Sequence, residues 1–353
     1  MGDIISIEKV LNSRCSSSFD NCDKKNHWGT FTYKKPKKGI MRQILECLNI
    51  PQFSNGKLYH WFEEGYIYLG LEKLNEPNDD RFLNIESGMQ QEAIYLACCA
   101  LGVGVCIYNQ GINGTSYREK ITTGKFLIME QVDPYYTGKY TTKDPGPNKP
   151  FKPGKNLNPP QRDGDIECLP QLKNLKLYNE QGSLTTINDI SQLLWAAKGR
   201  TPHYILPHAW NNVWGLTIPT WGGGQNYTNV FLITDRKLFQ YINWTKRFSR
   251  LSRLFLSCAK WTRGNPTHDI RFIRKINICT QFNEADTAII LCQNENTGRA
   301  LWEVGYMIEN MLLQASSLNI CYELKIFKTE ETSQLEKLKV KNVVAAILLK
   351  SVF

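Results

Sequence analysis

The sequence predicts an α+β fold made of two similar halves, and three observations support this prediction. The chain has 353 residues, more than a single hydrophobic core usually serves. The segment 86–92 returns at 303–309, with Glu, Gly and Glu at matching places in an apolar, helix-like pattern. The segment 51–59 returns at 219–227, sharing Pro, an aromatic residue, Gly and Tyr. Because the matches occur in the same order in each half, they indicate an internal repeat.

The first half alternates helices and strands. Apolar residues at helical spacing predict a helix near its start, and a second, shorter helix precedes a turn and a run of aromatic and β-branched residues that is typical of a strand. A long core helix follows, and two further apolar segments after it are predicted as strands. The expected helices are 4–12, 41–48 and 86–101, and the expected strands are 65–70, 103–107 and 125–129.

A proline-rich stretch separates the halves. Seven prolines lie from Pro134 to Pro160 among Gly, Lys and Asn, and this composition is too polar to pack as a helix or strand. We therefore expect a first domain over residues 1–133, a linker over 134–165 and a second domain over 166–353.

The second half repeats the order of the first and adds an insertion. The spacing between the turn and the core helix is 49 residues longer than in the first half, which predicts an insertion at about 234–286. Within it, the basic and apolar segment Lys246–Trp261 is expected to be helical. The other expected helices are 187–199 and 303–318, and the expected strands are 229–233, 288–291 and 342–349.

The amino-acid composition indicates which cellular compartment and which binding partners to expect. The net charge of +10 could attract a polyanion, but the lysines at 34–38 are better explained as a solvated loop, and no nucleic-acid-binding module is recognisable. The 11 cysteines include no C-x-x-C spacing and the five histidines have no metal-ligand spacing, so we expect reduced thiols, a cytoplasmic chain and no metal site. No apolar run is long enough to cross a bilayer.

The second half contains the phrase Ser191–Thr201, followed by a Pro-Thr-x-Gly-Gly turn and a strand. This order resembles the nitroreductase-like flavoenzymes, and it is most similar to the branch that includes the azoline dehydrogenases of peptide natural-product pathways. The first half resembles the same family at three places. These are the turn Ser54–His60, the helix end Leu101–Gly104, and Ser13–Phe19, where the family carries an Arg-Arg-Ser-x-Arg-x-Phe motif.

Members of that family are usually homodimers with two molecules of flavin mononucleotide (FMN) at the interface. The resemblance therefore implies two tandem nitroreductase-like domains that form a fused pseudo-dimer. The favoured site joins the arginine motif and helix end of the first half to the turn of the second. A guanidinium there suits a phosphate, and glycines let backbone N–H groups approach the ring. The residues assigned to cofactor binding are Arg14, Ser16, Gly102, Val103, Gly104, Thr220, Trp221, Gly222 and Gly223.

The same symmetry implies a second composite site, which is less well equipped. It would use the turn at 54–56, but Asn319 and Cys321 stand where the first half has Gly102 and Gly104. Their side chains are expected to crowd the ring, and no arginine motif precedes the second half. We therefore expect one FMN per chain. No residue is assigned a catalytic role, because the flavin carries the chemistry.

Departures from the family keep alternatives open. Ser13, Cys15 and Ser17 replace two arginines and a serine of the motif, and no Lys-Tyr pair precedes either core helix, which leaves azoline oxidation unsupported. The leading hypothesis is an FMN-dependent oxidoreductase that runs as a monomer and acts on a small molecule or peptide, with NAD(P)H as a candidate electron donor. The alternative is a cofactor-free relative that acts as a binding or interaction module.

Overall fold

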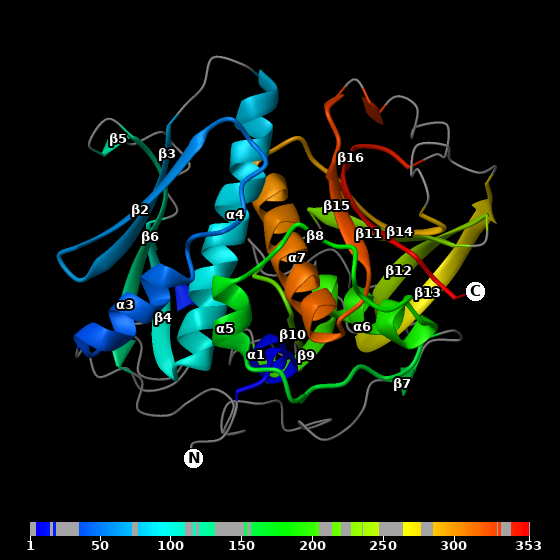
Figure 1. The fold of residues 1–353 in the computed structure, drawn as a ribbon, viewed down its shortest axis with the longest axis horizontal. Coiled ribbons are helices and arrows are strands. Elements are labelled where there is room, and N and C mark those ends of the chain that lie inside the picture. The colour runs from blue at the N-terminus through cyan, green and yellow to red at the C-terminus, as the bar shows by residue number, and fades with distance from the viewer. Residues whose placement is uncertain are drawn as a thin grey trace, which may run out of the picture.

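Two large sheets flank a central pair of long helices in the computed structural model (Figure 1). The structure describes residues 5–14, 17–18, 35–72, 77–109, 116–117, 120–130, 152–153, 157–204, 214–219, 227–234, 236–246, 264–276, 285–329, 331–332 and 340–352. No helix in these ranges is both long and apolar enough to cross a lipid bilayer.

The first half consists of an antiparallel sheet and one long helix. Its elements are α1 (Ile7–Ser13), β1 (Ser17–Ser18), α3 (Lys38–Glu46), β2 (Lys57–Glu63), β3 (Tyr66–Glu72), α4 (Pro77–Ala100), β4 (Val103–Asn109), β5 (Ser116–Tyr117) and β6 (Lys120–Glu130). The main strands have the order β4-β6-β3-β2, and α4 connects β3 to β4. The short strand β1 pairs in parallel with β4, and β5 pairs with β6.

The second half repeats this topology. Its elements after residue 165 are α5 (Cys168–Lys173), β8 (Tyr178–Asn179), α6 (Ile187–Lys198), β9 (Arg200–Tyr204), β10 (Trp214–Leu216), β11 (Thr228–Thr234), β12 (Lys237–Lys246), β13 (Gly264–Lys275), β14 (Thr287–Gln293), α7 (Gly298–Ser317), β15 (Tyr322–Ile326) and β16 (Val343–Leu349). The strand β7 (Lys152–Pro153) lies within the stretch 134–165, which the sequence predicts to form no strand, and it pairs with β13. The order β15-β16-β14-β11 matches β4-β6-β3-β2, and α7 connects β14 to β15 as α4 connects β3 to β4. The structure thus confirms the predicted α+β fold of two similar halves.

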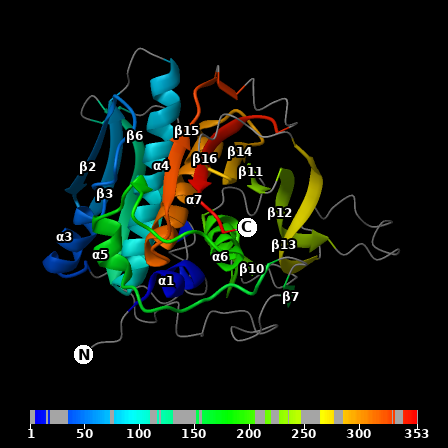
Figure 2. The ribbon, with the colours of Figure 1, turned by 45° about the vertical axis from the view of Figure 1, so that its right-hand side comes forward.

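The strands β12 and β13 have no counterpart in the described part of the first half. They pair with each other, and β12 pairs with the edge of β11 that faces away from β14. Both fall inside the insertion expected at 234–286, which extends the sheet outward (Figure 2). Of the predicted helix Lys246–Trp261, Lys246 instead ends β12, and residues 247–261 lie outside the described residues.

The central helices α4 and α7 pack together through one glycine each. A methyl group added at Gly305 would overlap the carbonyl oxygen of Ile85, and one added at Gly88 would overlap that of Trp302. Because neither glycine has a side chain, the two helix backbones approach each other closely. These glycines hold matching places in the repeated segments, so the repeat meets itself at the centre of the molecule.

The helix α6 contains most of the segment 191–201, which gives the second half its resemblance to the nitroreductase-like family. Thr186 caps its N-terminus by accepting a hydrogen bond from the backbone N–H of Asp189, whose side chain accepts one from the backbone N–H of Thr186. The run from Ile190 to Lys198 is buried, and Gly199 ends the helix as expected. Because α6 packs against α7, the end of α6 reaches the centre of the molecule.

The helix α1 precedes the first sheet in sequence but lies against the second half. Glu8 accepts hydrogen bonds from Gln314 Nε2 (2.6 Å) and from Ser317 Oγ (2.9 Å), both in α7. The helix also packs against α4. Both halves therefore contact α1, which brings Arg14, the residue after it, to their junction.

Candidate cofactor site at the junction of the halves

The structure describes part of the site that the sequence predicts. Arg14 and the helix end at 102–104 are described, whereas Ser16 and the turn residues 220–223 lie outside the described residues. The segment 214–219, which leads directly into that turn, is described as far as Pro219. The described residues therefore include both sides of the predicted site, up to the residue before the turn.

Arg14 links both halves from a buried position. Its side chain is 2% exposed. Nε donates to the carbonyl oxygen of Thr217 (3.1 Å), and Nη2 donates to that of Leu216 (3.0 Å). Nε also lies 3.2 Å from Oε1 of Glu92 in α4, and the guanidinium carbon lies 5.8 Å from the ring centre of Tyr95. One side chain thus connects the end of α1, the middle of α4 and the end of β10.

Thr217 is fixed from several directions. Its carbonyl oxygen, which accepts from the guanidinium, also accepts from Asn310 Nδ2 of α7 (2.9 Å). Its backbone N–H donates to Gly199, and its hydroxyl donates to the carbonyl oxygen of Trp195 (3.2 Å). These bonds hold the chain two residues before Pro219, so they set where the expected turn begins.

Two buried acids from the repeated segments lie in this region. Burial raises the pKa of Glu92 to about 7, although Arg14 and Asn310 favour its ionised form. Burial, and then the nearby Glu92, raise the pKa of Glu309 well above its usual range. Among the described residues, Glu309 has neither a hydrogen-bond partner nor an ion-pair partner. A buried carboxylate without a partner is costly, so these surroundings favour the neutral form of Glu309.

The backbone conformation at the end of α4 explains the first glycine of the segment 102–104. Gly102 follows α4 with a φ of 65°, and Asn319, at the matching place after α7, has a φ of 49°. Both residues end their helix in the left-handed conformation, which Gly adopts readily and Asn tolerates. The motif at Gly102 is therefore explained by helix termination, whereas Gly104 lies buried within β4.

Among the described residues, the second junction differs from the first because another segment covers it. A methyl group added at Gly182 would overlap the carbonyl group of Ile320 and the backbone nitrogen of Cys321. The N–H of Ser183 donates to the carbonyl oxygen of Asn319, and that of Cys321 donates to Ser183 (both 2.8 Å). The backbone that corresponds to 102–104 is thus engaged by residues 182–183.

Glu86 anchors the turn of the first half. Its Oε1 accepts from the backbone N–H groups of Phe53 (2.6 Å) and Ser54 (2.7 Å), and its Oε2 accepts from the Ser54 hydroxyl (2.6 Å). Burial raises the pKa of Glu86, while these three hydrogen bonds act in the opposite direction. The carboxylate therefore fixes the Ser54 turn onto α4.

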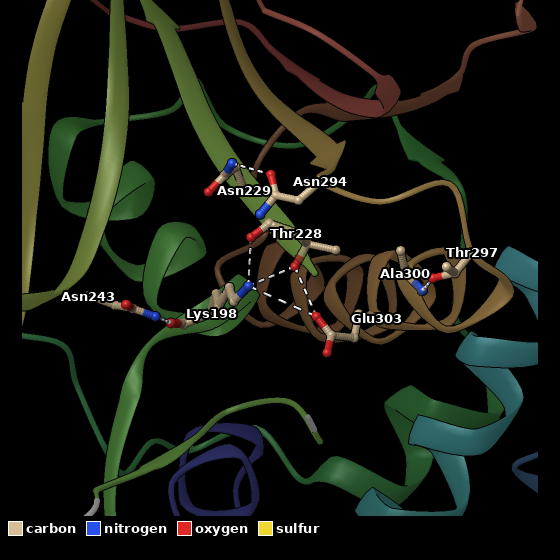
Figure 3. Close-up of polar contacts among 8 residues, drawn as sticks. All are labelled: Lys198, Thr228, Asn229, Asn243, Asn294, Thr297, Ala300 and Glu303. Carbon is tan, nitrogen blue, oxygen red and sulfur yellow. Dashed lines mark hydrogen bonds and ion pairs between the residues drawn. The ribbon is translucent and has the colours of Figure 1, made fainter. Parts of the chain in front are cut away.

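Glu303, the counterpart of Glu86, belongs to a buried cluster with Lys198 (Figure 3). Lys198 Nζ donates to the carbonyl oxygen and the hydroxyl of Thr228 (2.7 Å each) and lies 4.0 Å from Glu303 Oε2. The Thr228 hydroxyl donates to the same carboxylate oxygen (3.2 Å). Burial lowers the pKa of Lys198 to about 8, although Glu303 favours the ammonium form. Sequence reasoning singled out Glu303 as a repeat position but did not predict Lys198 or Thr228 as its partners.

His268 takes part in a second buried network. The Tyr241 hydroxyl and the Ser191 hydroxyl each lie 2.8 Å from one of its ring nitrogens, and Ser191 donates to the carbonyl oxygen of Asn158 (2.8 Å). Ser191 therefore accepts from Nε2–H, which leaves Nδ1 to accept from Tyr241. Burial, and then Arg162, lower the pKa of His268 to about 4. This arrangement fits a neutral structural histidine.

Comparisons with known proteins give a limited likeness. No family profile matches the sequence, and no curated protein matches it. A crystal structure of a candidate nitroreductase from Ralstonia eutropha JMP134 has a TM-score of 0.39 and 14% identity, over 58% of this chain and 98% of that one. A second, from Anabaena variabilis ATCC 29413, has a TM-score of 0.48 and 11% identity, over 81% of this chain and 69% of that one. Likeness at these scores and identities does not assign an activity to this chain.

Proposed function

We propose that the protein is an FMN-dependent oxidoreductase with one flavin site, at the junction where Arg14 meets Thr217. The observation that carries the proposal is the difference between the two junctions within the described part of the chain. At the first, α1, α4 and the segment entering the Pro219 turn are joined across the halves. At the second, residues 182–183 occupy the corresponding backbone. This difference supports one site per chain rather than two.

The described residues at the first junction suit a flavin. Arg14 Nη1 is buried and has no hydrogen-bond partner among the described residues, so a bound group could satisfy it. Gly104 is buried in β4 and presents backbone without a side chain. In the proposal, Gly102, Val103 and Gly104 face the ring from one side, and Ser16 and the turn residues 220–223 complete the site.

The proposed chemistry needs few protein side chains. Bound FMN would supply hydride and electron transfer, while the chain binds the ring, orients it and excludes water from it. We propose a small molecule or peptide as substrate and NAD(P)H as electron donor. The described cysteines are free thiols and mostly buried, which supports a reducing, cytoplasmic location.

Flavin content tests the proposal. After incubation with FMN, removal of unbound flavin and denaturation, the absorbance of released flavin should give one FMN per chain. Gly104→Val should lower FMN affinity about tenfold or more, because its methyl groups enter the space proposed for the ring. Cys321→Val, at the matching place in the second half, is the control and should leave the affinity unchanged. Two FMN per chain, or equal effects of the two substitutions, would contradict the site assignment.

A cofactor-free binding module is the second candidate function. The observation that favours it is the ion pair between Arg14 and Glu92, because a neutralised cation attracts a phosphate less. In that case the purified chain would release no flavin on denaturation and would not take up added FMN, measured by fluorescence titration. Such a result would replace the oxidoreductase proposal with this one.

A further inference from the structure

We infer that Arg14 is a positioning residue that holds the two walls of the proposed flavin site together, with Glu92 as its counter-charge. The inference rests on the proposed function, which it deepens by naming what controls the site. One wall is α4, which carries Glu92 and leads into residues 102–104. The other wall is the end of β10, whose Leu216 and Thr217 carbonyl groups lead into the Pro219 turn. Arg14 contacts both walls through separate atoms.

The geometry favours positioning over direct contact with a phosphate. The Arg14 side chain is 2% exposed, and both Nε and Nη2 already donate to backbone carbonyl oxygens at 3.0–3.1 Å, which leaves Nη1 as the guanidinium nitrogen without a partner among the described residues. A phosphate placed against the guanidinium would also lie near the Glu92 carboxylate, and like charges repel. The planar fork of arginine suits two neighbouring carbonyl groups, whereas a single ammonium group could not reproduce both bonds in the same directions.

The charge of Glu92 should control how firmly the walls are held. Arg14 faces Glu92 from the end of α1, Glu309 and Tyr306 face this region from α7, and Tyr95 and Cys99 lie on α4 itself. The described residues of β10 and Thr217 add no titratable group. Closing the junction brings Arg14 to 3.2 Å from Glu92, which favours the ionised acid. By linkage, burial in the closed junction outweighs the effect of Arg14 and raises the pKa of Glu92 to about 7, so the closed junction weakens as pH rises through about 7.

A comparison of FMN with riboflavin, which lacks the phosphate, separates positioning from phosphate binding. The measurement is flavin affinity by fluorescence titration in wild type, Arg14→Lys and Arg14→Met. If Arg14 positions the walls, both flavins should lose affinity by the same factor, about tenfold or more, in each variant. If Arg14 binds the phosphate, only FMN should lose affinity, and the inference would be overturned. Arg14→Lys keeps the charge, so it provides a folded variant should Arg14→Met fail to fold.

The pH profile gives a second readout that a general loss of stability would not reproduce. Wild-type affinity for riboflavin should fall as pH increases from about 6 to about 8, because the buried Glu92 loses its proton. Glu92→Gln cannot ionise and should show no such dependence. A wild-type profile that is flat over this range, or one that Glu92→Gln leaves unchanged, would overturn the inference.

Hydrogen exchange tests the same contacts without any flavin. Amides of residues 214–218 should exchange faster in Arg14→Lys than in wild type, while those of β14, which Arg14 does not contact, should keep their rates. If wild type binds no flavin, the proposed function fails, and the exchange experiment still decides whether Arg14 holds the walls. Equal exchange at 214–218 in both proteins would overturn the inference on its own.

Discussion

Buried charges in this protein meet partners that are distant in sequence. Arg14 reaches Thr217 across 203 positions, and Thr228 reaches Glu303 across 75. The sequence singles out Arg14 by its place in a motif, but it cannot predict that the side chain is buried against carbonyl groups, because the fold creates those contacts. Lys198 reads in the sequence as an ordinary lysine in the last turn of a helix, a common and favourable place for a cation. The sequence therefore gives no indication that Lys198 is buried.

The cluster around Lys198 leads to a prediction about stability. Lys198→Met should lower the free energy of unfolding by about 3–5 kcal/mol, because Glu303 then stays buried without its cation. The double variant Lys198→Met/Glu303→Gln should lose less than the sum of the two single variants. Urea denaturation measures all three. The exposed Lys57→Met is the control and should change stability by less than about 0.5 kcal/mol. Additive losses in the double variant would argue against the pair.

His268 predicts a specific dependence of stability on pH. Its pKa is about 4 in the folded protein and 6.5 in the unfolded chain. Between these values the unfolded chain binds the extra proton, so folding stability falls as pH decreases, by about 3 kcal/mol in total. His268→Gln should remove this component, so the difference in stability between wild type and variant should shrink from pH 6.5 to pH 4. Chemical denaturation at several pH values measures it. A constant difference would mean that His268 is not buried in its neutral form.

The periodic helices could be predicted from the sequence, while some strands could not. Apolar spacing located α4, α6 and α7, but α4 begins at Pro77, earlier than expected, because its first turn of Asn and Asp residues carries no apolar pattern. The strands β12 and β13 were missed for another reason. Their pairing has two irregularities in register, which break the alternation that predicts a strand.

The contact between α4 and α7 predicts opposite effects of the same substitution at two glycines of one helix. Gly305→Ala should lower the free energy of unfolding by about 3 kcal/mol, because the methyl group overlaps the Ile85 carbonyl oxygen and the helices must move apart. Gly298→Ala meets only ordinary van der Waals contact, at 3.5 Å from Asn84, and should stabilise α7 by up to about 1 kcal/mol. Thermal or urea unfolding compares them. Equal effects would show that α7 has room for a methyl group at Gly305 beside the Ile85 carbonyl oxygen.

The repeats in the sequence predict part of the arrangement of the whole molecule. Two ordered matches predicted two halves, and β12 and β13 lie within the range 234–286 that the excess spacing predicts as an insertion. The strand orders β4-β6-β3-β2 and β15-β16-β14-β11 were not predicted, because pairing between distant strands leaves no local pattern. For the site, motif order led to Arg14 and residues 102–104, but the covering of the second junction by residues 182–183 depends on folded contacts.

The chain should be a monomer in solution. Each half already has the other as the partner for its central helix, so no second chain is needed to bury that face. Size-exclusion chromatography with light scattering should give a mass close to 40.6 kDa at all concentrations tested. A mass twice this value that persists on dilution would contradict the prediction.

The hydrogen bond from Trp302 Nε1 to Asn84 Oδ1 (3.1 Å) joins the two central helices without a symmetric counterpart. The residues at the reciprocal places are Leu301 and Ile85, which have no side-chain polar atoms to form it. In an isologous homodimer, two-fold symmetry would make every such contact occur twice. A half expressed alone could therefore not form this hydrogen bond with a second copy of itself, whereas the two different halves can form it with each other.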